Sequence, residues 1–201
     1  MNIYRNEDIQ AITDQLDQIV DDSKTIRGKV LSPTLDDYKQ GMEVIRDYIK
    51  KKKRIVYGGD AYDKLVRNVG SDVIYTENCR KDIEFYTPEP IQDLVELCNL
   101  LHSKSFPWVQ GSQANHDETY KIFVNFENLC DMSYMPRNVF GNMPVIKING
   151  MLYAHPSWIL VDIFRQYNDP INSYWRLKDK TFFRGNILMR NYPLELDTSK
   201  K

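Results

Sequence analysis

The sequence predicts an α+β fold in which helices flank a mixed, mostly antiparallel sheet, and three observations lead to this prediction. Apolar residues recur at helical spacing before residue 54. Between residues 106 and 153 the apolar period changes to two, which is typical of strands joined by short turns. Helical spacing returns after Pro156, so helices and strands are grouped along the chain instead of alternating regularly.

Two amphipathic helices are expected in an N-terminal helical segment, residues 1–53. The first covers residues 6–22, whose apolar residues fall on one helical face, and Asn6 is its expected N-cap. The second is expected to begin at Ser32 and to end in the cationic run 50–54, because positive charge is favoured at a helix C-terminus.

The central segment, residues 54–155, is expected to contain the strands. Asn149 followed by Gly150 is the strongest turn signal and predicts a hairpin. The stretch 70–80 is expected to be a loop with one strand-like piece at 73–75. The expected strands are 55–57, 81–87, 106–113, 119–126, 129–135, 145–148 and 151–153, and the expected helices between them are 60–69 and 90–103.

A second helical segment is expected over residues 156–201. Its first helix is apolar and is broken by Asp169 and Pro170, after which a last helix rich in Tyr, Trp and Arg precedes a polar tail. Asp162 lies inside the apolar helix, where we expect it to form a structural ion pair with Arg165, one turn away.

Composition indicates one globular domain and excludes several classes of protein. The 201 residues are 42% hydrophobic and 27% charged, which excludes a disordered chain and a disulfide scaffold. The net charge of −1 excludes a basic coat, so a polyanion must be met by a local patch. No apolar run approaches the ~20 residues that span a bilayer, and the 3 cysteines lack metal-ligand spacing. We therefore expect a soluble, intracellular protein.

Two acidic residues on the strand 81–87 are the first candidates for chemistry. Asp82 and Glu84 are two positions apart, so on a strand they point to the same face about 6.6 Å from each other. Such a pair repels unless a cation lies between its members, and Mg²⁺ prefers oxygen ligands together with substrate phosphates. Considered alone, the pair is also compatible with two solvated acids on an edge strand.

A glycine pair and a third acid strengthen the metal hypothesis. Gly58 and Gly59 follow a strand and precede a helix, where backbone N–H groups form a small anion site. Asp131 lies in an otherwise apolar strand, and a buried charge needs a partner or a metal. A glycine pair, paired acids and a later strand acid, in this order, are typical of two-metal nucleotidyl transfer.

At these residues the chain resembles the poly(A) polymerase catalytic subunits of large DNA viruses, which are DNA-polymerase-β-like nucleotidyltransferases. The similarity is greatest to the giant-virus members and also extends to the poxvirus and asfarvirus enzymes. The matching blocks are YGGDAYDKL (57–65), KDIEFYTPEPIQDLVELCNLL (81–101), CDMSYMP (130–136), INGMLYAHPSWILVDIFRQYNDP (148–170) and WRLKDKTFFR (175–184).

The resemblance implies a nucleotidyltransferase palm over residues 54–155. It implies that Asp82, Glu84 and Asp131 are catalytic, metal-binding acids for Mg²⁺ or Mn²⁺ and that Gly58 and Gly59 contact the triphosphate of ATP. The implied reaction adds AMP from ATP to the 3′ end of RNA. The implied assembly is a homodimer or a complex with a processivity partner, and the implied locations are the virion and the viral factory in the host cytoplasm.

Three features depart from the family pattern. Asp60 stands where a small residue is usual, so it is expected to bring negative charge near the phosphates and, as a helix N-cap, to compete for their N–H groups. Tyr62 and Asp63 also differ from the small or polar residues expected there. The chain is shorter than the family's enzymes, which leaves open a fragment of a longer enzyme or a shortened paralogue.

Two basic clusters are candidate RNA contacts. Arg176, Lys178, Lys180 and Arg184 are interleaved with aromatic residues, a mixture that suits single-stranded RNA. The run 50–54 precedes the glycine pair and is expected to face RNA or the triphosphate. Both clusters are equally compatible with solvated helix faces. His102, His116 and His155 lack metal-ligand spacing and are expected to be surface or core residues.

Three functions remain open at this point. The first is a template-independent polynucleotide adenylyltransferase. The second is a catalytically silent protein of the same fold that acts as a dimerisation or RNA-binding module, which Asp60 and the chain length motivate. The third is a nucleotidyltransferase with another nucleotide or acceptor, such as a CCA-adding or uridine-adding enzyme.

Overall fold

The computed structural model of the chain describes residues 5–31, 35–71, 75 and 79–193. Its strands are β1 (Ile55–Tyr57), β2 (Ile83–Thr87), β3 (Gln110–Gln113), β4 (Thr119–Val124), β5 (Glu127–Tyr134), β6 (Val145–Ile148) and β7 (Met151–Ala154). Its helices are α1 (Asn6–Asp14), α2 (Leu16–Leu31), α3 (Leu35–Lys52), α4 (Gly58–Asn68), α5 (Pro90–Ser103), α6 (Arg137–Asn142), α7 (Pro156–Asn168), α8 (Tyr174–Arg176), the π-helical η1 (Leu177–Phe182) and α9 (Phe183–Asn191).

The described strands form one seven-stranded sheet with the order β3-β4-β5-β2-β1-β7-β6. Four of its pairings are antiparallel, and two, β2 with β5 and β1 with β7, are parallel. The mixed, mostly antiparallel sheet and the α+β class are therefore confirmed. The hairpin of β6 and β7 turns at Asn149 and Gly150, which both have the positive φ that this turn requires.

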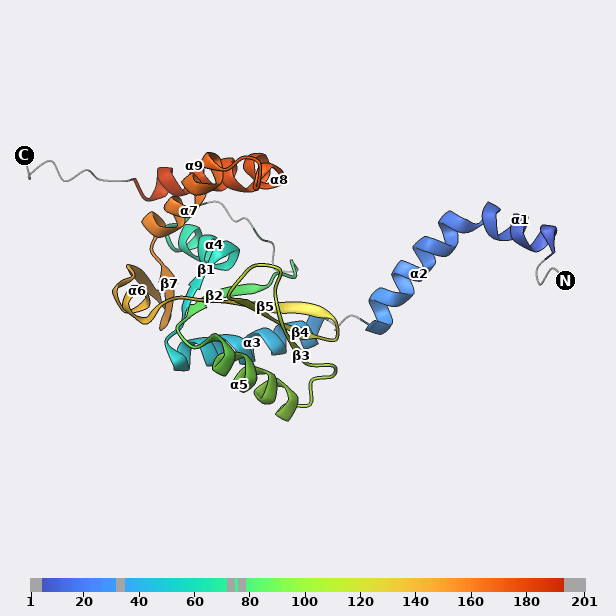
Figure 1. Cartoon of the computed structure of the whole chain (residues 1–201), viewed down its shortest axis with the longest axis horizontal. Helices are drawn as coiled ribbons and strands as arrows, with labels where there is room; N and C mark the ends of the chain where they lie inside the picture. The colour runs from blue at the N-terminus through green and yellow to red at the C-terminus, as the bar shows by residue number, and fades with distance from the viewer. Residues whose placement is uncertain (1–4, 32–34, 72–74, 76–78, 194–201) are drawn as a thin grey trace, which may run out of the picture.

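The two faces of the sheet have different roles. Helices α3 and α5 cover one face, and α4, α7 and α9 lie on the other (Figure 1). On β2, Ile83 and Phe85 point into the first layer, where they pack with Ile45 of α3 and Leu97 of α5. Because side chains alternate along a strand, Glu84 points to the opposite face, toward α4 and α7.

A second, smaller core joins the helices on that opposite face. Tyr62 of α4 is 1% exposed and packs with Leu160 of α7 and Leu188 of α9. This packing explains why a large residue replaces the small one expected at Tyr62. The helix that follows the glycine pair is thereby anchored to the C-terminal helices.

A buried acid connects the ends of three elements. Asp93, in the first turn of α5, is fully buried and receives two hydrogen bonds of 2.8 Å from the guanidinium of Arg54. The hydroxyls of Tyr48 in α3 and Thr87 in β2 also donate to Asp93, at 2.8 Å and 2.5 Å. Because a buried charge must be paired and hydrogen-bonded, this network fixes α5 against the beginning of β1 and the end of β2.

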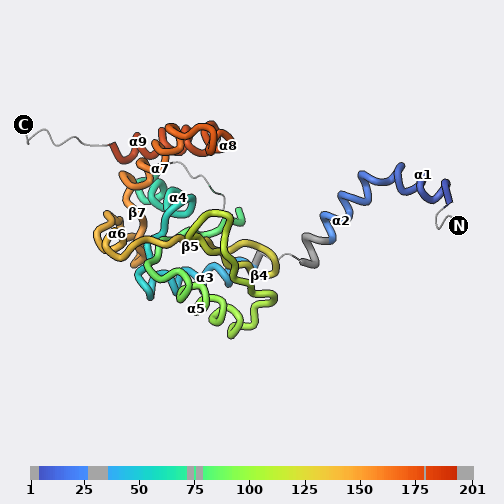
Figure 2. Tube along the Cα trace, viewed as in Figure 1, coloured from blue at the N-terminus to red at the C-terminus, as the bar shows by residue number. Residues whose placement is uncertain are grey.

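The N-terminal prediction is only partly correct. The segment 6–22 is helical but divides into α1 and α2, and Arg5, not Asn6, occupies the N-cap position of α1. The apolar stripe does not pack on the sheet: α1 and α2 extend away from it (Figure 2), and Ile9, Ile12 and Leu16 are each more than half exposed. The expected cap at Ser32 lies outside the described residues.

The remaining elements follow the prediction with local differences. The strand expected at 106–113 is shorter, as β3, and the expected 81–87 strand begins at Ile83. The last helix is divided by the π-helical η1, and α6 was not predicted. The strand-like piece 73–75 is described only at Tyr75, and residues 194–201 also lie outside the description. Among the described helices, none has the length and apolar character of a membrane span.

The Asp93 network predicts an asymmetric effect of two substitutions on the same helix. Asp93→Ala leaves the Arg54 guanidinium buried without its main partner and is expected to lower the free energy of unfolding by about 3–5 kcal/mol. Glu96→Gln disrupts the ion pair between Glu96 and Lys52, whose side chains are 36% and 30% exposed, respectively. Because this pair is exposed to solvent, the substitution is expected to cost less than about 1 kcal/mol. Urea denaturation measures both values, and equal losses would contradict the structural role of Asp93.

Candidate active site

The parallel pairing of β2 with β5 brings the three predicted acids together. Glu84 lies opposite Asp131 in the register of the two strands, and Asp82 precedes the first residue of β2. Alternation along β2 places Asp82 and Glu84 on the same face. All three carboxylates therefore lie on the sheet face opposite to α3 and α5, on adjacent strands.

Two of these carboxylates are linked directly by an amide. The Asn128 side-chain nitrogen donates to Asp82 Oδ2 at 3.1 Å and to Asp131 Oδ1 at 2.8 Å. The Lys121 ammonium lies 2.5 Å from the other oxygen of Asp131. Burial and the nearby charge of Asp131 raise the pKa of Asp82, while Lys121 acts in the opposite direction. The two acids are thus close neighbours held by a neutral donor and a cation.

The third carboxylate is turned toward the beginning of α4. Glu84 Oε2 accepts a hydrogen bond of 2.8 Å from the backbone N–H of Gly59. Burial, together with the charges of Asp82 and Asp131, raises the pKa of Glu84 to about 7, although the Gly59 N–H acts in the opposite direction. One of the two predicted phosphate-binding amides therefore already binds a carboxylate.

Gly58 permits this close approach. Its φ is +65°, and a Cβ atom at this position would lie 1.6 Å from Glu84 Oε2. Glycine is required here both for the backbone conformation and for the space that the Glu84 carboxylate occupies. The predicted glycine pair and the predicted acid are thus physically coupled.

The acids match the ligand chemistry of a hard divalent cation. Three carboxylates offer only oxygen donors, and the Lys121 ammonium on Asp131 is a positive charge already attracted to them. In the part of the chain that is described, however, no three His, Cys, Asp or Glu side chains are already arranged to hold an ion. The hydrogen bond from the Gly59 N–H to Glu84 is consistent with this finding, because it engages one of the three carboxylates. The assignment of the three acids as metal ligands remains a prediction.

Two cavities meet at Glu84. The larger, about 630 Å³, is lined by the aromatic residues Tyr57, Tyr86 and Trp158 together with polar side chains of β3, β4 and the loop between them. The smaller, about 200 Å³, lies over the glycine pair. Gly58, Glu84, Asp162 and Arg176 line both cavities. The acids therefore stand at the junction between an aromatic cavity and a smaller one at the N-terminus of α4.

Four cations surround the smaller cavity. Lys81 comes from the segment before β2, and Arg176, Lys180 and Arg184 come from the C-terminal helices. The Arg184 guanidinium donates to the Tyr75 hydroxyl at 2.7 Å, which holds it beside Gly59. Three members of the basic stretch expected to bind RNA thus lie against the glycine pair, whereas Lys178 does not line this cavity.

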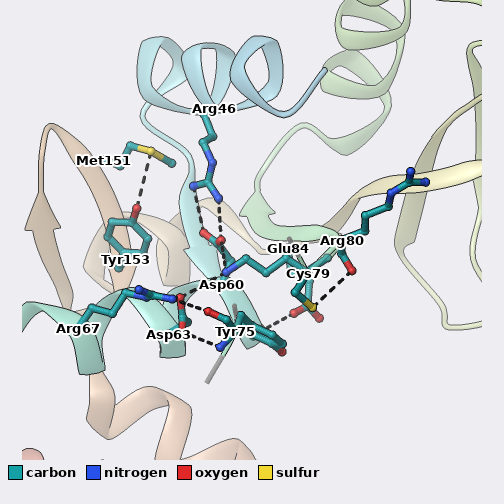
Figure 3. A network of polar contacts seen from close by, with 12 residues as sticks. Arg46, Asp60, Asp63, Arg67, Tyr75, Cys79, Arg80, Glu84, Met151 and Tyr153 are labelled. Carbon is teal, nitrogen blue, oxygen red and sulfur yellow. Dashed lines mark hydrogen bonds and ion pairs between the residues drawn. The ribbon is translucent and has the colours of Figure 1, made fainter. Parts of the chain in front are cut away.

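The expectation for Asp60 is only partly correct, because Asp60 lines the smaller cavity over the glycine pair but does not cap α4. Asp60 lies inside α4 rather than at its N-cap, is 4% exposed, and forms a bidentate pair with Arg46 at 2.6 Å and 3.1 Å (Figure 3). The Lys81 ammonium is 3.2 Å from the same carboxylate. These cations lower the pKa of Asp60 against the opposing effect of burial. Its charge is therefore neutralised by partners in α3 and before β2 instead of competing for the N–H groups.

Asp63 has a similar structural role. It accepts hydrogen bonds from the Arg67 guanidinium at 2.8 Å and from the Tyr75 backbone N–H at 3.2 Å (Figure 3). Tyr75 in turn contacts Arg184, so Asp63 supports one wall of the smaller cavity. The unusual acid after Tyr62 thus belongs to the framework of the site.

Two further expectations need correction. In the run 50–54, Arg54 is buried on Asp93 and Lys52 pairs with Glu96 at 2.6 Å, so these two cations face α5 and not RNA or a triphosphate. Asp162 does not pair with Arg165 among the described ion pairs. Its carboxylate accepts a hydrogen bond from Gln166 at 2.9 Å and lines both cavities.

The histidines differ in their surroundings. The His155 ring accepts a hydrogen bond from the Ser157 backbone N–H and caps α7, so it is a structural residue as expected. His102 is exposed in the last turn of α5. His116 lines the larger cavity, a location that its sequence context did not predict.

Three residues at the site were not found from the sequence. Asn128 and Lys121 contact the acids through a strand pairing that spacing alone does not reveal, and Asp162 was interpreted as structural. A signal was available for Lys121, because it alternates with the buried Ile122 on a predicted strand and so faces away from the core. Asn128 had no comparable signal.

These features define a class of protein. A mixed sheet with acids on adjacent strands, beside a helix that begins with two glycines, is the arrangement of a nucleotidyltransferase-like fold. Within this class the chain belongs to the family of poly(A) polymerase catalytic subunits, whose model matches residues 43–173. The family resemblance predicted from the sequence is confirmed.

Individual relatives agree with this assignment. The crystal structure of the Megavirus polyadenylate synthase superposes with a TM-score of 0.79 and 37% identity, covering 97% of this chain and 39% of that one. A protein of Acanthamoeba polyphaga mimivirus, named as a candidate poly(A) polymerase catalytic subunit, is 40% identical over 193 residues. A protein of African swine fever virus with the same name is 32% identical over 158 residues.

The coverage of the relatives is unequal. The mimivirus alignment includes 96% of this chain but 33% of the relative, and the African swine fever virus alignment includes 76% and 33%. The chain therefore spans about a third of the length of the curated relatives that it matches.

The fit of Glu84 against Gly58 predicts the effect of adding one methyl group. Gly58→Ala introduces both the strain of a positive φ, about 1–2 kcal/mol, and a collision with Glu84. Gly70→Ala is a matched control, because Gly70 has a φ of +72° and no atom of the described residues lies within 4 Å of the added Cβ. Denaturant unfolding should show a larger loss for Gly58→Ala, and equal losses would contradict the fit.

Proposed function

We propose that this chain carries the catalytic centre of a template-independent polynucleotide adenylyltransferase, which adds AMP from ATP to RNA 3′ ends. The observation that carries this proposal is the alignment of Asp82, Glu84 and Asp131 by β2 and β5, beside the glycine pair that begins α4. Family membership supports the same reaction. The RNA 3′ oxygen bonds to the α-phosphorus, the α–β phosphoanhydride bond breaks, and pyrophosphate and the hydroxyl proton leave.

The three carboxylates are the groups that would hold Mg²⁺ or Mn²⁺. A bound ion of this kind lowers the pKa of an attacking hydroxyl and neutralises charge on the leaving pyrophosphate. The protein's own contribution is to keep three like charges on one face, through Asn128, Lys121 and the Gly59 N–H. Phosphoryl transfer needs mainly such positioning and charge stabilisation.

The smaller cavity suits the triphosphate. The N-terminus of α4 carries a partial positive charge that favours an anion, and its Gly59 N–H already binds one, the Glu84 carboxylate. Lys81, Arg176, Lys180 and Arg184 add the positive charge that phosphates require. This arrangement changes the role of the basic stretch: we assign Arg176 and Lys180 to ATP rather than to the RNA path.

The larger cavity suits the RNA 3′ end. It adjoins Glu84 and Asp131, and Tyr57, Tyr86 and Trp158 offer aromatic surface on which bases stack. The rings of Tyr57 and Tyr86 stack on each other with centroids 3.9 Å apart, which makes part of this wall rigid. ATP and RNA would thus occupy two adjoining cavities that share Glu84.

The competing functions differ in what supports them. Asp60, which motivated a catalytically silent protein, is buried and paired, so it no longer argues against phosphate binding. Nothing in the lining of the cavities favours UTP or CTP over ATP, and family membership supports ATP. A homodimer or a processivity partner, and a location in the virion and the viral factory, are proposed from the family alone.

Removing a single acid should abolish the reaction. Asp82→Asn and Asp131→Asn are each expected to lower AMP incorporation into an RNA primer about 1,000-fold, because several kcal/mol of transition-state stabilisation is lost. Asp47→Asn, an exposed acid on the helix covering the other face, should have no effect. The measurement is labelled ATP incorporation with Mg²⁺, compared with UTP and CTP.

Two outcomes would contradict the proposal. Undiminished incorporation in Asp82→Asn would remove that acid from the site. A wild-type chain that bound no ATP with either Mg²⁺ or Mn²⁺ would favour the catalytically silent alternative, since ATP binding does not depend on an RNA partner.

The assignment of the basic stretch can be tested within the stretch itself. Arg176→Ala and Lys180→Ala are each expected to raise the Kd for ATP about 10-fold, because a hydrogen bond to a charged group contributes about 1.5–3 kcal/mol. Lys178→Ala removes an equal charge outside the cavity and should leave the Kd unchanged. Equal weakening by all three variants would indicate a general electrostatic effect instead of a triphosphate site.

A further inference from the structure

An extra residue in β5 changes the direction of one side chain at the site. Along the pairing of β4 with β5, Ile122 lies opposite Cys130, but the next residue, Phe123, lies opposite Asn128, so Leu129 is left over. This is a β-bulge, in which two residues of one strand oppose one residue of its partner. Leu129 and Cys130 are accordingly both fully buried, although they are consecutive.

The bulge has a consequence for Asn128. In a regular strand, Asn128 and Asp131 would point to opposite faces, because they are three positions apart. With the extra residue, Asn128 shares the face of Phe123, and therefore also the face of Lys121 and Asp131. Bulges next to active sites commonly redirect a side chain in this way.

The redirected amide has one proton for each of the two acids. A side-chain amide nitrogen carries two protons, and Asn128 uses them for one oxygen of Asp82 and one oxygen of Asp131. The amide cannot be reversed, because its oxygen would then face two carboxylates. In its present orientation that oxygen is buried without a hydrogen-bond partner among the described residues, so the acids alone determine how the amide points.

The amide and the ammonium hold the acids differently. Lys121 binds the second oxygen of Asp131 with a positive charge, so it competes with any cation that binds there. Asn128 is neutral and engages only one oxygen of each carboxylate, so it restrains both without cancelling their charge.

We propose that Asn128 is a positioning residue that presets Asp82 and Asp131 for a divalent cation. The inference rests on the proposed function, because it assigns a role to Asn128 only if these acids bind metal. Groups that orient metal ligands from outside the ligand set typically change metal affinity 10- to 100-fold when they are removed.

The test is a graded series measured by calorimetric titration of the full chain with Mn²⁺ alone. Asn128→Ala removes both donated protons and is expected to raise the Kd for Mn²⁺ at least 10-fold. Asn128→Ser keeps one donor and should give an intermediate value. The matched control is Asn125→Gly, which changes an asparagine of positive φ at the turn of the same hairpin and should leave the Kd unchanged.

Parallel assays separate positioning from a merely structural role. Thermal unfolding identifies any variant that fails to fold, and the Ser variant keeps the test decisive in that case. In primer extension, both Asn128 variants should need more Mg²⁺ for half-maximal rate, whereas the KM for ATP at saturating Mg²⁺ should not change.

The outcomes distinguish this inference from the proposed function. Wild-type Mn²⁺ affinity in folded Asn128→Ala and Asn128→Ser, together with weakened affinity in Asp82→Asn, would overturn the role of Asn128 and leave the metal site intact. Absence of Mn²⁺ binding to the wild-type chain would instead overturn the metal site, and with it both proposals.

Discussion

The mutual repulsion of three carboxylates on two adjacent strands is the constraint on which the rest of the site depends. The parallel pairing of β2 and β5 places Glu84 opposite Asp131, with Asp82 two residues before Glu84. Each acid is stabilised by a different kind of group: a backbone N–H for Glu84, a shared amide for Asp82 and Asp131, and an ammonium for Asp131. Burial and the charges of Asp82 and Asp131 nevertheless raise the pKa of Glu84 to about 7. The ionised form of the three-acid cluster is therefore costly without a counter-charge, which is the physical basis for attracting a cation.

Buried ion pairs fix the helices and strands that carry the site. Arg54 and Asp93 connect α5 to the ends of β1 and β2. Asp60 and Arg46 connect α4 to α3, so the helix that begins at the glycine pair is fixed to the helix on the other face of the sheet. Arg54 and Asp93 line neither cavity, whereas Asp60 also lines the smaller one. Together, the two ion pairs set the separation between the glycine pair and the acids. A shift of two residues along β1 or β2 would change that separation.

The sequence predicted the fold class, the strand order along the chain and the acids, because these depend on local patterns: period-two alternation, Asn149-Gly150, and the spacing of Asp82 and Glu84. It did not predict which residues those acids meet. Asn128 reaches the site only through a bulge between distant strands, and Asp60 is neutralised by Arg46 of α3. The run 50–54 was interpreted as solvent-facing or substrate-facing, but Arg54 is buried by the packing of α5. Local spacing reveals direction on one element, whereas partners across elements depend on tertiary packing.

Crystallography with anomalous scattering from Mn²⁺ tests most directly whether Asp82, Glu84 and Asp131 form one metal site. In crystals grown with Mn²⁺ and a non-hydrolysable ATP analogue, we expect an anomalous peak within coordination distance of these three carboxylates, with the triphosphate at the N-terminus of α4. A triphosphate bound there with no peak at the acids, or a peak only at other residues, would contradict a metal site formed by these acids.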